Sequence, residues 1–405
     1  MNKSKFFTGQ PIFGQLLSLL TPVGIGRIAA RNGSDYYCKR FSTYDHLVTM
    51  LYAVFNHCTA LREVTTGLLA WEQRITHLGL RHYPRRSTLS DANNRREAIV
   101  FEEIYKKVFE QYQDILSDSR PKKKRSQLYI FDSTTLSLFQ EVLRTSGRPA
   151  LNGKRKGGIK VHTLIRSDQD VPYLIRYSPA TSNDSQFLKE IKLPKGSVIV
   201  FDRGYKDYRT FNRFTEEGIT WVTRLRKRTS SRTVRRLTIS EQCSQQGVLK
   251  DQQVELGNTH HSNTVKVPAR IVTYRDPQTH ERFTFLTNNL TISSLSVANY
   301  YRKRWQIELL FKRLKQNYPL QYFLGNSENA IQIQIWCVLI ADLLLKVIKK
   351  QNACKWSFSN LCSLIRLHLM TYIQLKEFIK SAEKALLKKI QQYKQMASSY
   401  SLFPT

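Results

Sequence analysis

Residues 301–315 read Tyr-Arg-Lys-Arg-Trp-Gln-Ile-Glu-Leu-Leu-Phe-Lys-Arg-Leu-Lys, and this is the most informative stretch of the chain. The spacing of its apolar residues predicts one α-helix, in which each residue turns about 100° around the axis. One face of that helix carries a phenol, two cations and a carboxylate, which are Tyr301, Arg304, Lys315 and Glu308. The apolar stripe beside them would seat the helix on a core. Such a face suits an acid that holds a metal ion beside a phosphate. A basic amphipathic helix with one solvated Glu is the alternative.

Two aspartates follow short apolar runs, Leu-Tyr-Ile-Phe before Asp132 and Val-Ile-Val-Phe before Asp202. Both runs are β-branched or aromatic and contain no Pro, so they predict buried strands. An Asp at the carboxyl end of each strand would lie at the sheet edge, where ligands bind in open α/β sheets. A single strand-end Asp is more often a cap or turn residue. Together with Glu308, however, the two aspartates predict a hard-cation site with oxygen ligands.

These residues resemble the DDE transposases of bacterial insertion sequences. More narrowly, they resemble the cut-and-paste branch of that family, which carries a Tyr-Arg-Glu-Lys signature. The resemblance rests on Asp132, on Asp202 within Asp-Arg-Gly-Tyr, and on Glu308 within the spaced signature, and it spans residues 127–320. The segments 6–13, 44–47 and 85–89 also resemble the amino-terminal domain of that branch.

The resemblance implies an α/β fold with a ribonuclease H-like catalytic core, an inserted β subdomain, a helical N-terminal DNA-binding domain and a helical C-terminal region. The expected boundaries are 1–118 for the DNA-binding domain, 119–126 for a basic linker, 127–225 and 291–325 for the core, 226–290 for the insertion, and 326–405 for the C-terminal region. An insertion is expected because 106 residues separate Asp202 from Glu308, too many for one crossover.

The apolar patterns agree with this layout. In the core they predict strands at 127–132, 136–141, 159–166, 171–177, 198–202 and 220–223, with helices at 185–191 and 208–217. In the insertion they predict strands at 265–274 and 283–286. The N-terminal part should form helices at 12–20, 44–55, 61–69 and 88–115.

The charge points to a polyanionic partner. Lys and Arg number 64 against 31 acids, a formal net charge of +33, and nucleic acid is the first candidate. Ribosomal or membrane-surface binding would fit the charge alone. Four arginines surround the start of helix 88–115 and are predicted to contact phosphates, namely Arg85, Arg86, Arg95 and Arg96. Arg203, Arg226 and Arg228 are predicted to contact the DNA backbone beside Asp202, although a solvated hairpin would also carry such charges.

Residues 330–348 form the most apolar region, but Gln332, Gln334 and Asp342 interrupt it. This predicts a buried helix and no membrane span. The six cysteines show no C-x-x-C spacing, so we expect reduced, mostly buried thiols in a cytoplasmic protein. For a bacterial transposase, the resemblance adds association with the nucleoid.

The resemblance also implies a mechanism. Asp132, Asp202 and Glu308 would hold two Mg²⁺ ions, with Mn²⁺ able to substitute, and these ions would clamp the attacking and leaving oxygens. Tyr301, Arg304 and Lys315 would hold phosphates. The expected partners are double-stranded DNA with terminal inverted repeats, target DNA, and a second copy of the chain in a homodimer on DNA. Excision would pass through hairpin ends.

Two other functions remain open from the residues alone. One is a metal-dependent nuclease of the same fold that cuts without joining. The other is a DNA-binding protein that descends from a transposase and has lost catalysis. The insertion contains no Trp, so Tyr274, Phe283 and Phe285 are its candidate rings for capturing a flipped base. Trp305 is expected to pack in the core.

Overall fold

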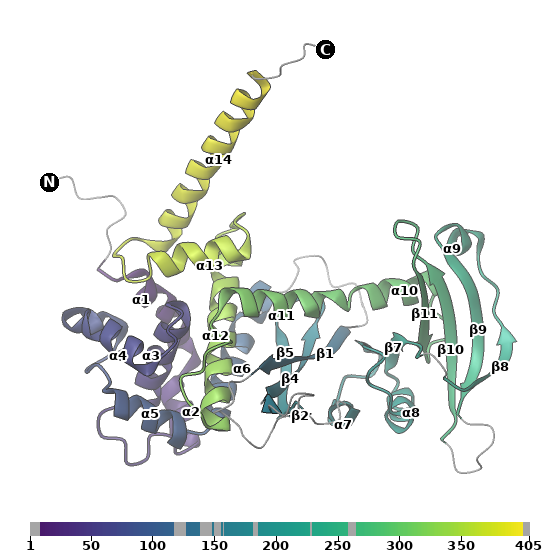
Figure 1. Ribbon diagram of the computed structural model, residues 1–405, viewed down its shortest axis with the longest axis horizontal. Coiled ribbons are helices and arrows are strands. Elements are labelled where there is room, and N and C mark those ends of the chain that lie inside the picture. The colour runs from purple at the N-terminus through teal and green to yellow at the C-terminus, as the bar shows by residue number, and fades with distance from the viewer. Residues whose placement is uncertain are drawn as a thin grey trace. The chain divides into compact units, whose positions relative to one another are not determined.

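The computed structural model describes residues 9–116, 127–137, 148–149, 155–156, 158–180, 185–226, 229–257 and 265–399. The chain forms two compact units (Figure 1). A helical unit combines Met1–Ser117 with Arg313–Thr405, and a sheet unit comprises Asp118–Lys312. The predicted linker 119–126 and Arg228 lie outside the described residues.

The sheet unit is built on a nine-stranded mixed sheet in the order β5-β4-β1-β6-β7-β11-β10-β9-β8. Its strands are β1 (Leu128–Ser137), β4 (Gly158–Arg166), β5 (Pro172–Pro179), β6 (Val198–Phe201), β7 (Thr220–Arg224), β8 (Ser231–Arg236), β9 (Val248–Leu256), β10 (Val267–Arg275) and β11 (Arg282–Thr287). β1, β6 and β7 are parallel, and all other neighbours are antiparallel. A separate hairpin joins β2 (Arg148–Pro149) to β3 (Arg155–Lys156).

Helices cover both faces of the central strands (Figure 1). Ile199 and Phe201 of β6 pack with α7 (Ser185–Leu188) and α8 (Tyr208–Glu216). Val198 and Val200 face the other way and pack with α10 (Ser294–Arg302). Burial on both faces explains why β6 is an unbroken apolar run with no polar alternation.

The predicted strands agree with this sheet, with three differences. The predicted strand 127–132 and the start of the predicted strand 136–141 belong to one strand, because β1 pairs with β4 from Tyr129 to Ser137 without a break. Residues 138–141 lie outside the described residues. β8 and β9, together with the short helix α9 (Glu241–Gln245), were not predicted. The strands of residues 231–287 also continue the main sheet, because β11 pairs with β7.

The helical unit contains most of the remaining elements. These are α1 (Ile12–Leu17), η1 (Ser18–Val23), α2 (Ile25–Arg31), α3 (Thr43–Phe55), α4 (Leu61–Leu69), η2 (Glu72–Leu78), α5 (Arg86–Arg95), α6 (Ala98–Leu116), α12 (Glu328–Gln351), α13 (Phe358–Leu367) and α14 (Leu375–Ser399). α11 (Trp305–Asn317) begins in the sheet unit and ends in this one. Residues 326–405, expected as a separate region, share a unit with the N-terminal helices because α12 contacts α3, α5 and α6.

The polar residues of α12 are satisfied inside the protein. Asp342 is 2% exposed and pairs with Arg313, with an Oδ1–Nε distance of 3.2 Å. The Gln334 side chain accepts from the backbone N–H of Leu324 at 2.8 Å. α12 is long and apolar enough to cross a membrane, but 89% of its apolar window is buried, as in the core helix of a globular protein. Five of the six free cysteines are also buried.

The predicted helix 88–115 is two helices, α5 and α6. Arg96, between them, is extended, with φ of −76° and ψ of 129°. Its side chain is 5% exposed and donates hydrogen bonds to the Phe41 carbonyl and to Cys38 Sγ. The prediction that Arg96 contacts phosphate is therefore wrong, because this guanidinium is used inside the helical unit.

Candidate active site

The sheet register places Asp132 beside Asp202. Parallel strands β1 and β6 pair from Leu128 with Val198 up to Phe131 with Phe201. Asp132 and Asp202 are the next residues on the two strands, so their carboxylates reach the same edge. Asp202 follows the end of β6, as predicted. Asp132 does not end β1, because β1 continues opposite β4 after β6 has stopped.

The signature stretch is not one helix. α10 ends at Arg302 and α11 begins at Trp305. At the junction the backbone N–H of Arg304 donates to Tyr301 O at 2.9 Å, and that of Gln306 donates to Lys303 O at 3.0 Å. These bonds span three residues, so the chain passes through one turn tighter than an α-helix. The prediction of a single uninterrupted helix was wrong, but Arg304 still contacts both Glu308 and the Tyr301 ring.

Arg304 and Tyr301 contact all three predicted acids. Arg304 Nη1 donates to Asp132 Oδ2 at 2.8 Å, and its Nη2 donates to Glu308 Oε1 at 2.5 Å. The Tyr301 hydroxyl donates to Asp202 Oδ1 at 3.3 Å. The Arg304 guanidinium also lies over the Tyr301 ring, 5.6 Å from its centroid. Asp132, Asp202 and Glu308 are therefore parts of one site.

Burial controls the electrostatics of this site. Burial, with smaller contributions from the charges of Asp202 and Glu308, raises the pKa of Asp132 to about 6, although the Ser133 N–H and Arg304 act to lower it. Burial likewise raises the pKa of Tyr301 to about 12, so its hydroxyl remains a proton donor. Burial opposes the charge on Arg304, but Tyr301, Asp132 and Glu308 together hold its pKa above the ordinary value.

The donor chemistry of the site fits a hard divalent cation, because carboxylate oxygens are the ligands such ions prefer. In the described part of the chain, however, no three His, Cys, Asp or Glu side chains lie in a metal-binding arrangement. The Arg304 guanidinium supplies the positive charge between Asp132 and Glu308. Its Nε is buried without a hydrogen-bond partner among the described residues, so the pairing leaves one donor unsatisfied. An unsatisfied buried donor costs free energy, so the pairing of Arg304 is not ideal.

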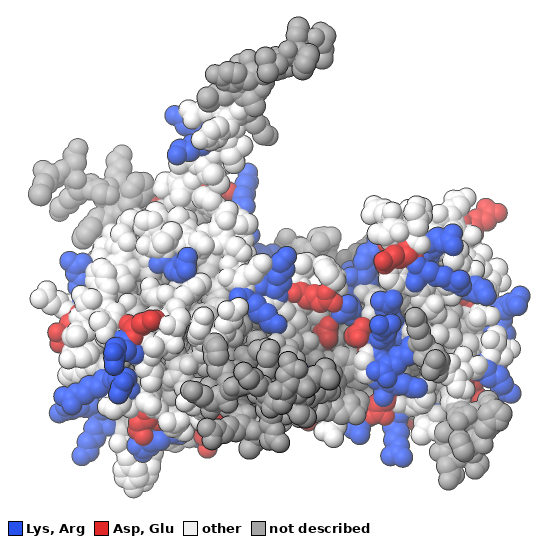
Figure 2. Space-filling view, in the orientation of Figure 1, with Lys and Arg blue, Asp and Glu red and all other residues white. Residues whose placement is uncertain are grey.

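Basic residues flank the acids. Arg203 follows Asp202 and is exposed, and Arg226 is exposed and donates to Gly204 O at 3.2 Å. A shallow groove runs between them, lined in part by Lys206 and Arg224. Lys206 was not predicted from the sequence, although its position two residues after Gly204 could have pointed to it. In Figure 2, acidic groups lie in the middle of the visible face, with Lys and Arg gathered beside them toward β7, β10 and β11.

The other predicted phosphate contacts lie in or toward the helical unit. Lys315 is on α11, seven residues after Glu308, and partial burial lowers the pKa of its amine. Arg85 and Arg86 are exposed at the start of α5, which has no side-chain cap on its first amides. A cavity of about 820 Å³ beside them is lined by Arg62 and Arg86. Open amides and guanidinium groups of this kind suit phosphate.

The aromatic residues singled out in the sequence differ in their exposure. Tyr274 and Phe285 are buried, and Phe283 is partly buried with the Arg224 guanidinium 5.0 Å from its ring centroid. Of these three candidate rings, Phe283 alone is accessible. Trp305 is 59% exposed, so its expected core role is wrong; it begins α11 beside the tight turn, away from the apolar stripe. His162 is buried, bonded to Ser178 and stacked near Phe131, which is a structural role.

Comparison with known proteins yields two family matches. The family described as "Transposase DDE domain" matches residues 123–344, and a "Domain of unknown function (DUF4372)" matches residues 8–81. The named "Putative transposase y4zB" of Sinorhizobium fredii is 31% identical over 66% of this chain and 73% of its own length. The "Putative transposase for insertion sequence element IS4SA" of Synechocystis sp. is 27% identical over 65% and 71%. Among solved structures, a piggyBac transposase synaptic complex with hairpin DNA aligns with the whole chain and 88% of its own, at 11% identity and a TM-score of 0.42, a likeness too slight to carry an argument.

Proposed function

Because the chain belongs to the DDE transposases of insertion sequences, we propose that it binds the ends of its own element, cleaves them, and joins them to target DNA. The observation that carries this proposal is the convergence of Asp132, Asp202 and Glu308 on Arg304 and Tyr301. Carboxylates with a purely structural role would each need only a counter-ion. Three acids from a central strand, a strand end and a helix suit phosphoryl transfer.

The proposed core is ribonuclease H-like. Its support is the order β5-β4-β1-β6-β7, in which an antiparallel meander is followed by two parallel strands. This arrangement brings the acid on β1 beside the acid after β6. The strands of the proposed insertion, β8 to β11, extend the sheet from β7 and lead into α10.

In the proposed mechanism Asp132, Asp202 and Glu308 hold divalent cations, of which Mg²⁺ best matches oxygen ligands and two per site suit strand transfer. When bound, these cations supply the charge that activates water and stabilises the leaving oxygen. With such cations bound, Arg304 would no longer be needed as the counter-ion of Asp132 and Glu308, and its planar fork would suit a DNA phosphate. Tyr301 keeps its proton and donates a hydrogen bond beside Asp202.

DNA would lie along the basic residues of both units. Arg203 and Arg226 flank the acids, while Arg85 and Arg86 offer a second set of contacts in the helical unit. We further propose that a homodimer assembles on two element ends and that excision is of the cut-and-paste kind, with hairpin ends.

An in vitro reaction tests this function. Purified chain is mixed with Mg²⁺, labelled DNA that carries the two ends flanking its gene, and a target plasmid. We expect nicks at the ends, then double-strand breaks, then joined products in the plasmid. Cleavage without joining would point to a nuclease, and binding without cleavage would point to a non-catalytic DNA-binding protein.

Metal affinity should depend on pH. Metal ions bind the ionised carboxyl, and the Asp132 pKa of about 6 keeps this group protonated in mild acid. Affinity for Mn²⁺ should therefore rise by about tenfold per pH unit below about pH 6 and level off above about pH 7. Calorimetric titration of the chain at several pH values measures this. Asp132→Asn should lose Mn²⁺ binding at every pH; binding by that variant with an unchanged pH profile would assign the titrating group elsewhere.

Arg304 and Arg302 form a matched pair for testing the signature. Arg302 is 63% exposed at its side chain and pairs with Asp276 at 3.6 Å, away from the acids. Arg304→Ala should slow the steps after the first nick by about ten- to a hundredfold, because a charged hydrogen bond contributes about 1.5–3 kcal/mol. Arg302→Ala should have little effect. Time courses that resolve nicked, hairpin and broken DNA measure both. Equal damage from the two variants would contradict the geometry of the site.

A further inference from the structure

A surface loop in the helical unit has features that catalysis does not use. Residues 33–41 read Gly-Ser-Asp-Tyr-Tyr-Cys-Lys-Arg-Phe, and we call them the tyrosine loop. Tyr36 is 72% exposed and Tyr37 is 84% exposed. Their ring centroids are 4.2 Å apart, so the loop presents two adjacent aromatic rings to solvent. Two large exposed rings side by side are unusual on a protein surface that binds no other molecule.

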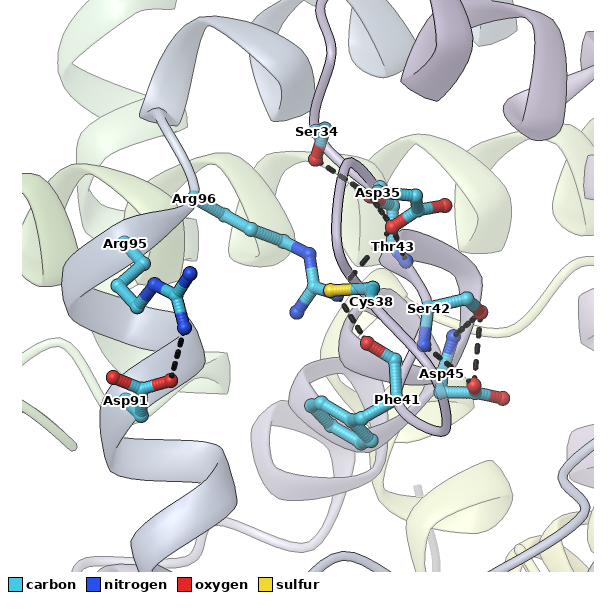
Figure 3. Close-up of polar contacts among 10 residues, drawn as sticks. All are labelled: Ser34, Asp35, Cys38, Phe41, Ser42, Thr43, Asp45, Asp91, Arg95 and Arg96. Carbon is cyan, nitrogen blue, oxygen red and sulfur yellow. Dashed lines mark hydrogen bonds and ion pairs between the residues drawn. The ribbon is translucent and has the colours of Figure 1, made fainter.

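The loop is fixed at its base by polar contacts (Figure 3). Asp35 Oδ1 accepts from both the backbone N–H and the hydroxyl of Thr43, each at 2.7 Å. Ser34 Oγ lies 2.6 Å from Thr43 Oγ1. Arg96 reaches from the α5–α6 junction to the Phe41 carbonyl, and it lies 3.1 Å from Cys38 Sγ. The base of the loop is thus held by buried and half-buried groups, and little of the loop's order would be lost on binding.

The backbone at Tyr37 adds an independent observation. Its φ is +59°, in the left-handed region that is costly for a bulky side chain and free for Gly. A ring that is 84% exposed gains little packing to offset that cost. Strained residues of this kind gather at functional sites, where the side chain is needed for a partner.

The surroundings of the rings favour nucleic acid as that partner. Lys39 and Arg40 follow the two tyrosines after Cys38, and both are exposed. A cleft of about 250 Å³ beside the loop is lined by Tyr36, Phe41 and Arg95, among others. Aromatic rings bind unpaired bases by stacking, and adjacent cations bind the phosphates that connect them. A base within an intact duplex has no free face, so the ligand must offer an unpaired one.

We propose that the tyrosine loop binds an unpaired DNA base, which stacks against the adjacent rings of Tyr36 and Tyr37 while Lys39 and Arg40 hold neighbouring phosphates. This inference rests on the proposed function, since DNA is its substrate. It assigns a ligand to a segment within residues 8–81, which match a family of unknown function. Because stacking is tolerant of sequence, any unpaired base should serve.

The test compares two DNA probes on the full-length chain. One is a short, fully paired duplex, and the other is the same duplex with a single-stranded tail that contains 2-aminopurine. The unaltered chain should prefer the tailed probe and quench its fluorescence. Replacing both rings, by Tyr36→Ala with Tyr37→Ala, should weaken binding of the tailed probe by about tenfold and leave the paired probe unchanged. Tyr393→Ala removes another ring of the helical unit, 69% exposed, and should change neither.

A second variant separates binding from folding. Tyr37→Gly relieves the left-handed backbone, so its thermal unfolding temperature should stay equal or rise while its preference for the tailed probe falls. A fall in thermal stability would show that the ring is structural and would overturn the proposal. A changed oligomeric state with unchanged DNA binding would assign the loop to a protein interface and overturn it too. No DNA binding by the unaltered chain would overturn both this proposal and the proposed function, whereas binding without preference for the tail would overturn this one alone.

Discussion

Asp132→Asn should abolish strand cleavage while leaving DNA binding nearly intact, and Asp202→Asn and Glu308→Gln should do the same. Each substitution keeps the shape of the side chain and removes a charge that the proposed cations need. Charge stabilisation by bound metal contributes several kcal/mol to such reactions, and each 1.36 kcal/mol is a factor of ten. We therefore expect a loss of about a thousandfold or more. Nicking of labelled end DNA measures cleavage, and a gel-shift assay measures binding.

Asp168 provides the matched control for these three variants. It lies in the same unit, its side chain is 44% exposed, and it pairs with Arg166 at 2.9 Å. Asp168→Asn should cleave at the rate of the unaltered chain. Substantial cleavage by any one of the three active-site variants would remove that residue from the site.

Arg270→Ala should strongly destabilise the sheet unit. Arg270 is 5% exposed at its side chain and Asp251 is 1% exposed, and two hydrogen bonds of 2.8 and 2.6 Å join them. Removing one partner leaves a buried charge uncompensated, which costs about 3–5 kcal/mol. The free energy of unfolding, measured with urea, should fall by that amount.

The pair also bears on function. Arg270 Nη1 donates to the carbonyls of Asn289 and Ile292, just before α10, the helix that carries Tyr301. Hydrogen exchange in α10 should therefore increase in Arg270→Ala. Arg232 is the control, since it is 66% exposed and lies 3.7 Å from Glu255, and its loss should cost less than about 1 kcal/mol. Similar effects of the two substitutions would show that the buried pair contributes no more than a surface pair.

The three candidate acids could be picked out from the sequence because local patterns mark their positions. β-branched and aromatic runs before Asp132 and Asp202 predict buried strands, and β4, β6 and β7 appear within one residue of their predicted bounds. The end of β6 could be predicted from the polar turn after it. The continuation of β1 past Asp132 could not be predicted, because it depends on pairing with β4, which is remote in sequence.

Three further features were set by tertiary contacts that a pattern cannot show. The helix 88–115 is broken because Arg96 turns inward to Phe41 and Cys38, far away in the sequence. The signature helix tightens at Lys303 and Arg304, where Arg304 must reach two carboxylates at once. The C-terminal helix α12 shares a core with α3 and α6, although more than two hundred residues separate them. The positive charge of Arg96 led to the prediction of a phosphate contact, and the burial of its side chain excludes that contact.

The binding of Mn²⁺ to the unaltered chain, to Asp132→Asn and to Arg304→Ala tests most directly whether the three acids form one cation site that Arg304 neutralises. Calorimetry follows binding without any need for DNA cleavage. We expect saturable binding by the unaltered chain, loss of that binding in Asp132→Asn, and tighter binding in Arg304→Ala, because the competing guanidinium is gone. Equal affinity in all three proteins would show that Asp132 and Arg304 do not share a cation site, and it would contradict the proposed active site.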